Sequence, residues 1–519
     1  VVLVDEIARV IRECHTPKST MGKDARRVWD KLTGMMRAAD LAVGVDADLS
    51  TADVTMLAAA VGTPMHVWVV DEAKRDKHAT FVSDEQIMAE IDMAVSDGQR
   101  VLIVADSANR IAGLADELSG RYPSKRIFAV HNKRGIATTG TPEAKALLSD
   151  INAECARYDV LLLSPAVESG VSLNVAHFDR HFGLYCGQVE PSAFNQQLLR
   201  DRTAVEWRIA ITGTGRQSRP GTYAEILSGL HAGARRVRAL DGERGEIAAA
   251  SPFDHDVCRA AAAANAARNR YGQQLWLLLE ARGWTVTHGP SGKPKAGADL
   301  RADAKDALRI KQTTAIAQAP DRPAREVDAL REAYTVTPEQ SAIVARADVR
   351  DALGLPSGKI TPDDVDAWAD GKLESQNALF EAATAAPIAP SARDDADYVG
   401  HVSLALRSLD AARTEAARAL FAALGLDLET GAGEVTDESA RAAYLSLKDT
   451  EQGRVLSHFG IARFAGGVPA YPIRWVNDVL ARFGLWLDCK RHKGAGGSAG
   501  RVYALADDEM RDRAGRFKL

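Results

Sequence analysis

Two pairs of charged residues in the first half of the chain have the types and spacing needed for phosphate chemistry. The acidic pair, Asp5 and Glu6, directly follows an apolar run at residues 1–4, which predicts a buried strand. An aspartate at the end of a strand could orient a magnesium ion, and the adjacent glutamate could activate a water molecule. The alternative interpretation is a strand that ends at an acidic pair on the surface.

The basic pair, Arg200 and Arg202, follows Gln196 on a short polar segment. Fixing two guanidinium groups so close together is unfavourable unless they meet an anion, so the segment indicates a phosphate partner. The alternative is a solvated helix face. Upstream, Ser169 and Gly170 come just after a continuous apolar run. Small residues there let the backbone approach a ligand at the carboxyl edge of a parallel sheet, although an ordinary turn would have the same composition.

A second strand near the amino terminus also ends in carboxylates, because Asp46 and Asp48 follow another apolar run. For Asp48, capping of the helix that comes next is an equally good explanation. Ser107 and Asn109 follow a further expected strand and could likewise contact a ligand or cap a helix. All of these side chains are expected at strand ends, the edge at which parallel sheets bind ligands.

Taken in order, these blocks resemble motifs II to VI of superfamily-2 helicases. They read DEI, VDADLS, VLIVADS, LLLSPAVESGVS and QQLLRDR. They are most similar to the branch that contains herpesvirus origin-binding proteins and bacterial plasmid replication proteins of the cyanobacterial type. The similarity covers about residues 1–215, with a weaker likeness at the carboxyl end. It implies a motor with two RecA-like lobes, ATP and magnesium as cofactors, DNA as partner, and replication proteins as further candidate partners.

The resemblance also implies roles for the candidate residues. Asp5 and Glu6 would form the Walker B pair, with magnesium at Asp5. Ser169 and Gly170 would belong to motif V, which links the nucleotide to the nucleic acid. The remaining candidates are the motif III carboxylates Asp46 and Asp48 near the nucleotide, and the motif VI residues Gln196, Arg200 and Arg202. Motif VI would supply the arginine finger that stabilises charge on the γ-phosphate.

A phosphate-binding loop of the form G-x-x-x-x-G-K-[ST] is absent from the sequence. Partial matches near Gly22, Gly292 and Gly358 each lack a required glycine, hydroxyl or spacing. Together with the resemblance, this leads us to expect an amino-terminally truncated helicase with an incomplete first lobe. The chain by itself is not expected to hydrolyse ATP.

Composition sets the broader limits. The 519 residues are enough for roughly three or four domains. A charged content of 26% and a net charge of −5 exclude a uniformly basic coat for nucleic acid, so any DNA contact must be local. The five cysteines form no C-x-x-C pair, which disfavours a zinc site and favours the cytoplasm. No apolar run could span a bilayer, so no membrane partner is expected.

Strands that alternate with helices predict an α/β fold of RecA-like lobes, followed by mostly helical regions. The expected domains are a partial first lobe at 1–75, a second lobe at 83–215, a helical accessory region at 216–380, a linker at 381–400 and a helical, winged-helix-like domain at 401–519. Two local predictions are a strand over 64–70 and one long helix over 254–282.

The last segment predicts a hairpin that could bind DNA. Two short strands flank the loop GAGGSA and carry four basic residues, Lys490, Arg491, Lys493 and Arg501. Helices followed by such a hairpin are the outline of a winged helix, whose basic arm would contact phosphates. The alternative is a hairpin that packs on its helices, with the basic residues protecting an edge strand.

Two functions of different class remain open. The first is an ATP-dependent DNA helicase or translocase acting in the initiation of plasmid or phage replication, of which the chain is a fragment. The second is an origin-binding initiator that uses a RecA-like scaffold without hydrolysing ATP.

Overall fold

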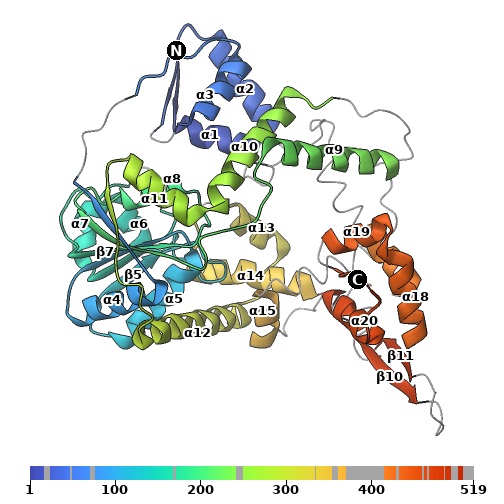
Figure 1. Ribbon diagram of the computed structural model, residues 1–519. Coiled ribbons are helices and arrows are strands. Elements are labelled where there is room, and N and C mark those ends of the chain that lie inside the picture. The colour runs from blue at the N-terminus through green and yellow to red at the C-terminus, as the bar shows by residue number, and fades with distance from the viewer. Residues whose placement is uncertain are drawn as a thin grey trace.

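The computed structural model (Figure 1) contains an open parallel sheet with helices on both faces, a smaller amino-terminal unit and a carboxyl-terminal helical module. It describes residues 1–16, 24–46, 49–69, 76–167, 171–240, 249–333, 335–353, 360–369, 414–427, 432–458, 461–464, 467–483, 485–492 and 501–505. Within these ranges, no helix has the length and apolar content needed to cross a membrane.

The largest sheet has seven strands in the order β5-β6-β4-β7-β8-β3-β9, and every neighbouring pair is parallel. The strands are β3 (His78–Val82), β4 (Val101–Ala105), β5 (Ile127–Val130), β6 (Val160–Leu163), β7 (Arg180–Tyr185), β8 (Glu206–Ile211) and β9 (Thr285–His288). The central strands β4 and β6 are buried along their whole length, as continuous apolar runs predict for strands covered on both faces. The α/β class expected from the sequence is confirmed.

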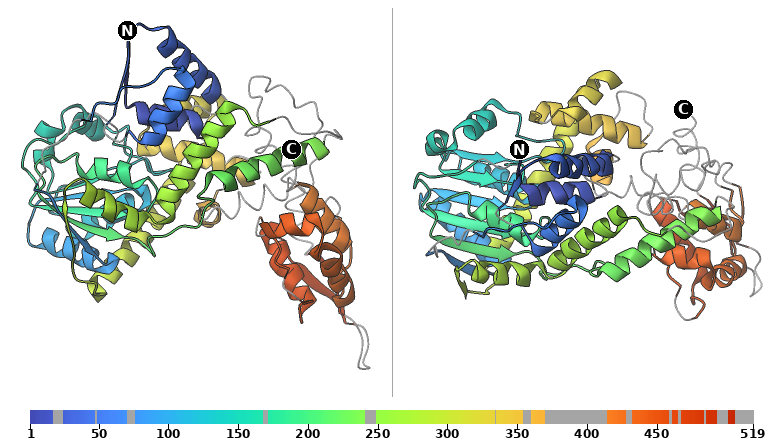
Figure 2. Two further views of the ribbon diagram at one scale, coloured as in Figure 1. Left: turned by 45° about the horizontal axis from the view of Figure 1, so that its top comes forward. Right: turned by 90° about the horizontal axis from the view of Figure 1, so that it is seen from above.

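Helices cover both faces of this sheet (Figures 1 and 2). One face packs against α4 and α5, and the other packs against α6, α7, α8 and α11. Their bounds are α4 (Asp84–Ser96), α5 (Ala108–Arg121), α6 (Pro142–Ser149), α7 (Ile151–Glu154), α8 (Pro191–Leu198) and α11 (Tyr271–Ala281). Of the described candidate residues on this sheet, Gln196 lies in α8, and Ser107, Arg200 and Arg202 lie in the connections between strands and helices.

Three strands of the sheet are not predicted from the sequence. β3 and β9 form one edge of the sheet, and their outward positions are polar, with Thr80 and Thr287 hydrogen-bonded side by side. β7 begins with Arg180 and His181 and contains Gly183, so its sequence has no continuous apolar run that would predict a strand. β9 lies in the region where the sequence predicts helices, and its pairing with β3 extends the sheet beyond residue 215.

The strand expected over residues 64–70 is wrong. Residues 64–69 are not in a strand, and residue 70 lies outside the described part of the chain. Trp68 and Val69 are 91% and 85% exposed. An apolar run forms a strand only where a neighbour can take its backbone hydrogen bonds, and none of the described strands pairs with this segment.

The amino-terminal unit is built on a parallel pair of strands, β1 (Val2–Asp5) and β2 (Ala42–Val45). Its helices are α1 (Ile7–His15), α2 (Ala25–Ala38), α3 (Thr51–Val61) and α10 (Pro252–Asn269). The core of the unit joins Ile7 and Trp29 to Phe253 and Val257 of α10, so a helix from the middle of the chain completes it. The strand predicted at residues 1–4 is present as β1, but it is not buried, because the other side of the strand pair is open and Leu3 is 69% exposed.

The single helix predicted over 254–282 is two helices, α10 and α11. The break is at Arg270, whose backbone (φ −133°, ψ 45°) is not helical. α10 packs into the amino-terminal unit, whereas α11 packs against the large sheet through Tyr271 and Leu275. The two halves change direction because they bury their apolar faces against different units.

Further helices pack on these two units (Figure 1). The helices flanking and following α10 and α11 are α9 (Tyr223–Leu240), α12 (Lys295–Gln318), α13 (Ala324–Glu332), α14 (Pro338–Leu353) and α15 (Pro362–Ala369). α12 packs closely on α4 and α5 at two glycines. A β-carbon on Gly113 would overlap the carbonyl oxygen of Ala304, and one on Gly297 would overlap that of Glu85. The close fit makes α12 an integral part of the sheet unit.

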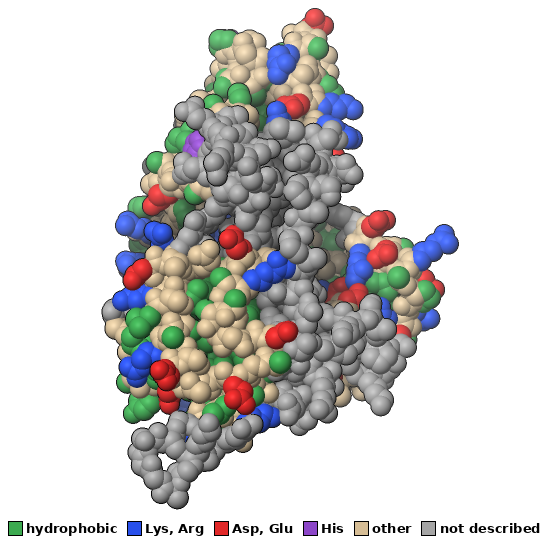
Figure 3. Space-filling model, turned by 90° about the vertical axis from the view of Figure 1, so that its right-hand side faces the viewer, with side chains coloured by type: hydrophobic (Ala, Val, Ile, Leu, Met, Phe, Trp, Pro, Cys, Tyr) green, Lys and Arg blue, Asp and Glu red, His purple; other side chains and the backbone are tan. Residues whose placement is uncertain are grey.

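The carboxyl-terminal module contains a helix at 414–424, α18 (Asp437–Lys448), α19 (Glu451–His458), α20 (Pro472–Leu480) and the antiparallel hairpin of β10 (Leu487–His492) and β11 (Arg501–Leu505). Leu420, Tyr444 and Val476 share its core. Val435 forms an antiparallel bridge with Tyr503 of β11, which adds a strand position between the first two helices. The module faces the viewer in Figure 3, where basic and acidic side chains are intermixed.

Candidate functional site

The acidic pair lies where β1 passes into α1. Asp5 ends the strand, and its Oδ1 accepts a hydrogen bond (3.0 Å) from the backbone N–H of Glu6. Glu6 has a left-handed backbone (φ 52°, ψ 44°), and no other non-glycine residue in the described ranges has a positive φ. A bulky residue in this conformation is strained, and such outliers cluster at functional sites. The strain suggests that the acidic pair does more than end a strand.

Asp46 lies beside the acidic pair. β1 and β2 run parallel with Asp5 next to Val45, so Asp46 follows at the same edge. Its Oδ2 accepts a hydrogen bond (2.9 Å) from the backbone N–H of Ala8 in the first turn of α1. The carboxylate therefore satisfies a donor of the helix end and holds α1 against β2.

Helix caps account for two other polar positions. α3 is capped by Ser50, whose hydroxyl and backbone are both paired with Asp53 in a capping box. The interpretation of Asp48 as the cap of this helix is therefore wrong, because the chain enters the helix two residues later. Ser107 caps α5 by accepting a hydrogen bond (3.5 Å) from the backbone N–H of Arg110. Helix capping is thus the role that the structure gives Ser107.

The basic pair follows the end of α8, which packs against the sheet through Phe194 and Leu198. Gln196 lies on the exposed side of this helix, Arg200 is half-buried and Arg202 is exposed. The helix is fixed in the core, while Arg202 is accessible and Arg200 is partly accessible. This arrangement can present positive charge to an anion at a defined position.

The segment that resembles motif V is hydrogen-bonded to the basic pair. The N–H of Leu173 donates to the carbonyl oxygen of Arg200 (2.8 Å), and the N–H of Arg202 donates to the carbonyl oxygen of Leu173 (3.0 Å). Nη1 of Arg200 also donates to the carbonyl oxygen of Val171 (3.4 Å). The structure therefore brings together two segments whose roles were predicted separately.

Some predicted site residues lie outside the described part of the chain, namely Asp48, Ser169, Gly170 and Lys493. In the carboxyl-terminal hairpin, Lys490 of β10 and Arg501 of β11 are exposed, and Arg491 of β10 pairs with Val502 of β11. The hairpin lies in a different module from the acidic and basic pairs. The predicted residues that the structure describes thus form separate groups on the amino-terminal unit, the large sheet and the carboxyl-terminal module.

Arg12 of α1 connects the amino-terminal unit to the large sheet. Its Nη1 lies 3.5 Å from Oε2 of Glu190, and its Nη2 lies 3.9 Å from Oδ2 of Asp53. Glu190 is the residue before α8. An ion pair therefore links the helix that follows Glu6 to the helix that precedes the basic pair, although a partly exposed pair adds only about 0–1 kcal/mol of stability.

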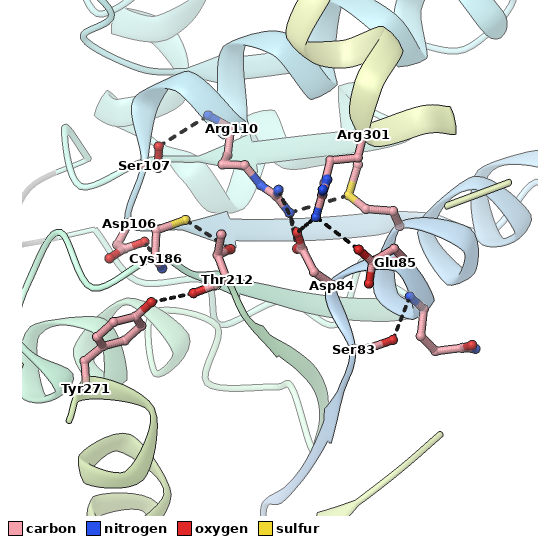
Figure 4. A network of polar contacts seen from close by, with 12 residues as sticks. Ser83, Asp84, Glu85, Asp106, Ser107, Arg110, Cys186, Thr212, Tyr271 and Arg301 are labelled. Carbon is pink, nitrogen blue, oxygen red and sulfur yellow. Dashed lines mark hydrogen bonds and ion pairs between the residues drawn. The ribbon is translucent and has the colours of Figure 1, made fainter. Parts of the chain in front are cut away.

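Residues that the sequence did not single out organise the carboxyl edge of the large sheet (Figure 4). Asp106, at the end of β4, accepts a hydrogen bond (2.7 Å) from the N–H of Cys186. Burial raises the pKa of Asp106, and hydrogen bonds from backbone amides only partly offset this effect. Asp84 accepts hydrogen bonds from Arg110 (3.1 Å) and from Arg301 of α12 (2.9 Å). These carboxylates fix the loops and α12 and are committed to structural partners.

Asp201 and Asn152 are further polar residues that the sequence reasoning missed. Asp201 is fully buried beside His181, and Asn152 hydrogen-bonds the backbone on both sides of Leu173. An acidic residue between two arginines would ordinarily be assigned to the surface. Its burial follows from tertiary pairing, for which the local sequence carries no signal.

The acidic pair has the chemistry to bind magnesium together with a phosphate. In the described ranges, no group of three or more His, Cys, Asp or Glu side chains is arranged to hold a metal alone. Magnesium needs no such cage, because it binds through one or two carboxylates, phosphate oxygens and water. Asp5 is exposed at the end of its strand and meets this requirement.

Comparisons with known proteins add little beyond the geometry. No family model matches the chain. It is 26% identical over 332 residues to an uncharacterized protein of Picosynechococcus sp. (strain PCC 7002), a match that covers 60% of this chain and 32% of that protein. The chain thus spans about a third of the length of this relative. One solved structure that aligns with this chain is that of Mycobacterium smegmatis helicase Lhr bound to ssDNA and AMP-PNP. The alignment covers 98% of this chain and 64% of the Lhr chain, at 13% sequence identity and a TM-score of 0.32. A score this low assigns neither fold nor function.

Proposed function

We propose that the chain is part of an ATP-dependent DNA helicase or translocase that acts in the initiation of plasmid or phage replication. The observation that carries the proposal is the strained, left-handed Glu6 next to Asp5 at the end of a parallel strand. Backbone outliers of this kind cluster at functional sites, and a strand-end acidic pair can hold magnesium and activate water for ATP hydrolysis. The order of the sequence motifs supports the same function.

Each group would have a distinct role in the reaction. Magnesium bound at Asp5 would neutralise charge on the phosphates. Glu6 would orient the attacking water and accept its proton. Arg200 and Arg202 would meet the negative charge that develops on the transferred phosphoryl group. Gln196 lies two turns or less before them on the exposed side of α8 and could contact the same ligand.

Two contacts support coupling between nucleotide and DNA. The Arg200 guanidinium binds the carbonyl oxygen of Val171, so an event at the arginines would reach the segment that resembles motif V. The Arg12–Glu190 ion pair joins the two units that a motor must move against each other. Closure of such units around ATP would change the position of both segments on a DNA strand.

DNA-stimulated ATP hydrolysis by the full protein encoded by the gene tests this proposal. Glu6→Gln keeps the size of the side chain and removes its ability to accept a proton. We expect kcat to fall by about 10²- to 10⁴-fold. Glu13→Gln, on the helix that follows Glu6, is the matched control and should leave kcat within about twofold of the wild type. Equal rates for the wild type and Glu6→Gln would contradict the proposal.

The second candidate function is an origin-binding initiator that does not hydrolyse ATP. It is favoured by the exposed Lys490 and Arg501 on the hairpin, which could contact DNA phosphates. A wild-type protein that binds origin DNA and never turns over ATP, with DNA binding unchanged in Glu6→Gln, would support this function.

A further inference from the structure

Asp201 lies between the two arginines of the basic pair and is fully buried. Its Oδ1 accepts hydrogen bonds from the N–H and the hydroxyl of Thr203 (2.9 and 2.7 Å) and from the N–H of Ala204 (3.2 Å). Its Oδ2 lies 3.0 Å from Nε2 of His181 on β7. Burial acts to raise the pKa of Asp201, but these hydrogen bonds outweigh it and hold the pKa below its ordinary value. Asp201 is thus an anion anchored to the sheet.

This anchor fixes the backbone between the two arginines. Asp201 and Leu173 form an isolated parallel bridge, in which Leu173 bonds to the backbone of both Arg200 and Arg202. Side chains of extended backbone alternate between opposite sides. The Asp201 side chain is in the core, whereas Arg202 is exposed and Arg200 is half-buried, with its Nη1 on the carbonyl oxygen of Val171.

The opposite half of the bridge is held in a similar way by Asn152 of α7. Its Nδ2 donates to the carbonyl oxygen of Ser172 (3.0 Å), and its Oδ1 accepts from the N–H of Asn174 (2.7 Å). These groups flank Leu173 on both sides. Two polar side chains therefore hold the bridge, Asn152 on the Leu173 side and His181, through Asp201, on the other.

We propose that Asp201 and His181 are positioning residues that aim both guanidinium groups of the basic pair at one anionic ligand. The inference rests on the proposed function, because it takes that ligand to be the phosphates of ATP. Removal of the His181 contact would leave a buried carboxylate oxygen unsatisfied, which is costly. The bridge would rotate to expose Asp201 to water, and the same rotation would turn the arginines away from their ligand.

The test combines hydrogen–deuterium exchange with ATPase kinetics on the full protein encoded by the gene. His181→Leu removes the contact with Asp201, and His181→Gln keeps a nitrogen donor near the position of Nε2. His177→Leu is the matched control, because Nε2 of His177 contacts the carbonyl oxygen of Tyr158 (2.9 Å), away from the bridge. Asp201→Asn keeps the shape of the side chain without its charge, and it serves if His181→Leu does not fold.

We expect His181→Leu to speed exchange of the Leu173 and Arg202 amides by tenfold or more, on the order expected for local opening. The same variant should lower kcat about 10- to 100-fold and change KM by less than about threefold. His181→Gln should restore the wild-type exchange rate and kcat, and His177→Leu should change neither of them. Asp201→Asn should have the same effects as His181→Leu. Faster exchange with an unchanged kcat would show a merely structural role and overturn the proposal, as would unchanged exchange.

The outcomes separate this inference from the proposed function. If the wild type hydrolyses no ATP, the proposed function fails, and exchange at Leu173 and Arg202 then decides whether the bridge depends on His181. If the wild type hydrolyses ATP and Arg200→Ala is impaired while His181→Leu is not, the proposed function stands and the positioning role is overturned.

Discussion

Acidification should weaken the fold through His131, the residue after β5. His131 is 3% exposed, and its Nδ1 accepts a hydrogen bond (3.3 Å) from the backbone N–H of Lys133. Burial lowers the pKa of His131 from 6.5 to about 4, and the charges of Lys311 and Lys133 act in the same direction. The folded protein therefore keeps this imidazole neutral at pH values where the unfolded chain protonates it.

The sign and the size of the effect follow from proton linkage. Between pH 6.5 and about 4, the unfolded chain binds a proton that the folded protein does not. The free energy of unfolding therefore falls as the pH is lowered through this window, and the contribution of His131 is constant above it. The loss is about 2 kcal/mol at about pH 5 and approaches about 3 kcal/mol below the folded pKa.

Urea unfolding of the wild type and His131→Asn, at about pH 7.5 and about pH 5, measures this contribution. Asparagine keeps an acceptor near the position of Nδ1 but cannot be protonated. We expect the wild type to lose about 2 kcal/mol more than the variant between the two conditions. Equal losses would refute the reasoning, because every other titrating group is present in both proteins.

Three further predictions concern packing, capping and DNA binding. In urea unfolding, Gly113→Ala should lower the free energy of unfolding by about 1–3 kcal/mol, because the added methyl group would overlap the carbonyl oxygen of Ala304. Gly120→Ala, whose methyl group would enter open space on the same helix, should raise it by about 0.5–1 kcal/mol. Ser251→Ala should cost about 1 kcal/mol in the same assay, because it removes the capping box of α10. Lys490→Ala should flatten the slope of log K against log salt for DNA by about 1, and an unchanged slope would exclude its phosphate contact.

The core of the large sheet was predictable, because β4 and β6 are continuous apolar runs buried on both faces. β3 and the edge strand β9 were not, since both are short and carry polar residues such as Thr80 and Thr287, which pair only in the folded sheet. The break at Arg270 was also hidden from the sequence. The helical pattern runs through it, and the bend exists because α10 and α11 pack on different units.

The site was predictable where it depends on strand ends. Asp5 and Glu6 follow an apolar run, and the structure places them at the end of a parallel strand. The strain at Glu6 was not predictable, because backbone angles outside the common regions depend on tertiary contacts. The burial of the Asp201 side chain could not be predicted from the sequence for the same reason. It depends on a bridge to Leu173, which is distant in sequence.

The most direct test of the central claim compares ATP hydrolysis by Arg200→Ala and Arg202→Ala with that of the wild-type full protein. If the basic pair meets the charge on the transferred phosphoryl group, at least one variant should lose about 10³-fold or more in kcat while still binding DNA. If both variants hydrolyse ATP within about twofold of the wild type, the basic pair plays no part in the reaction and the account is contradicted.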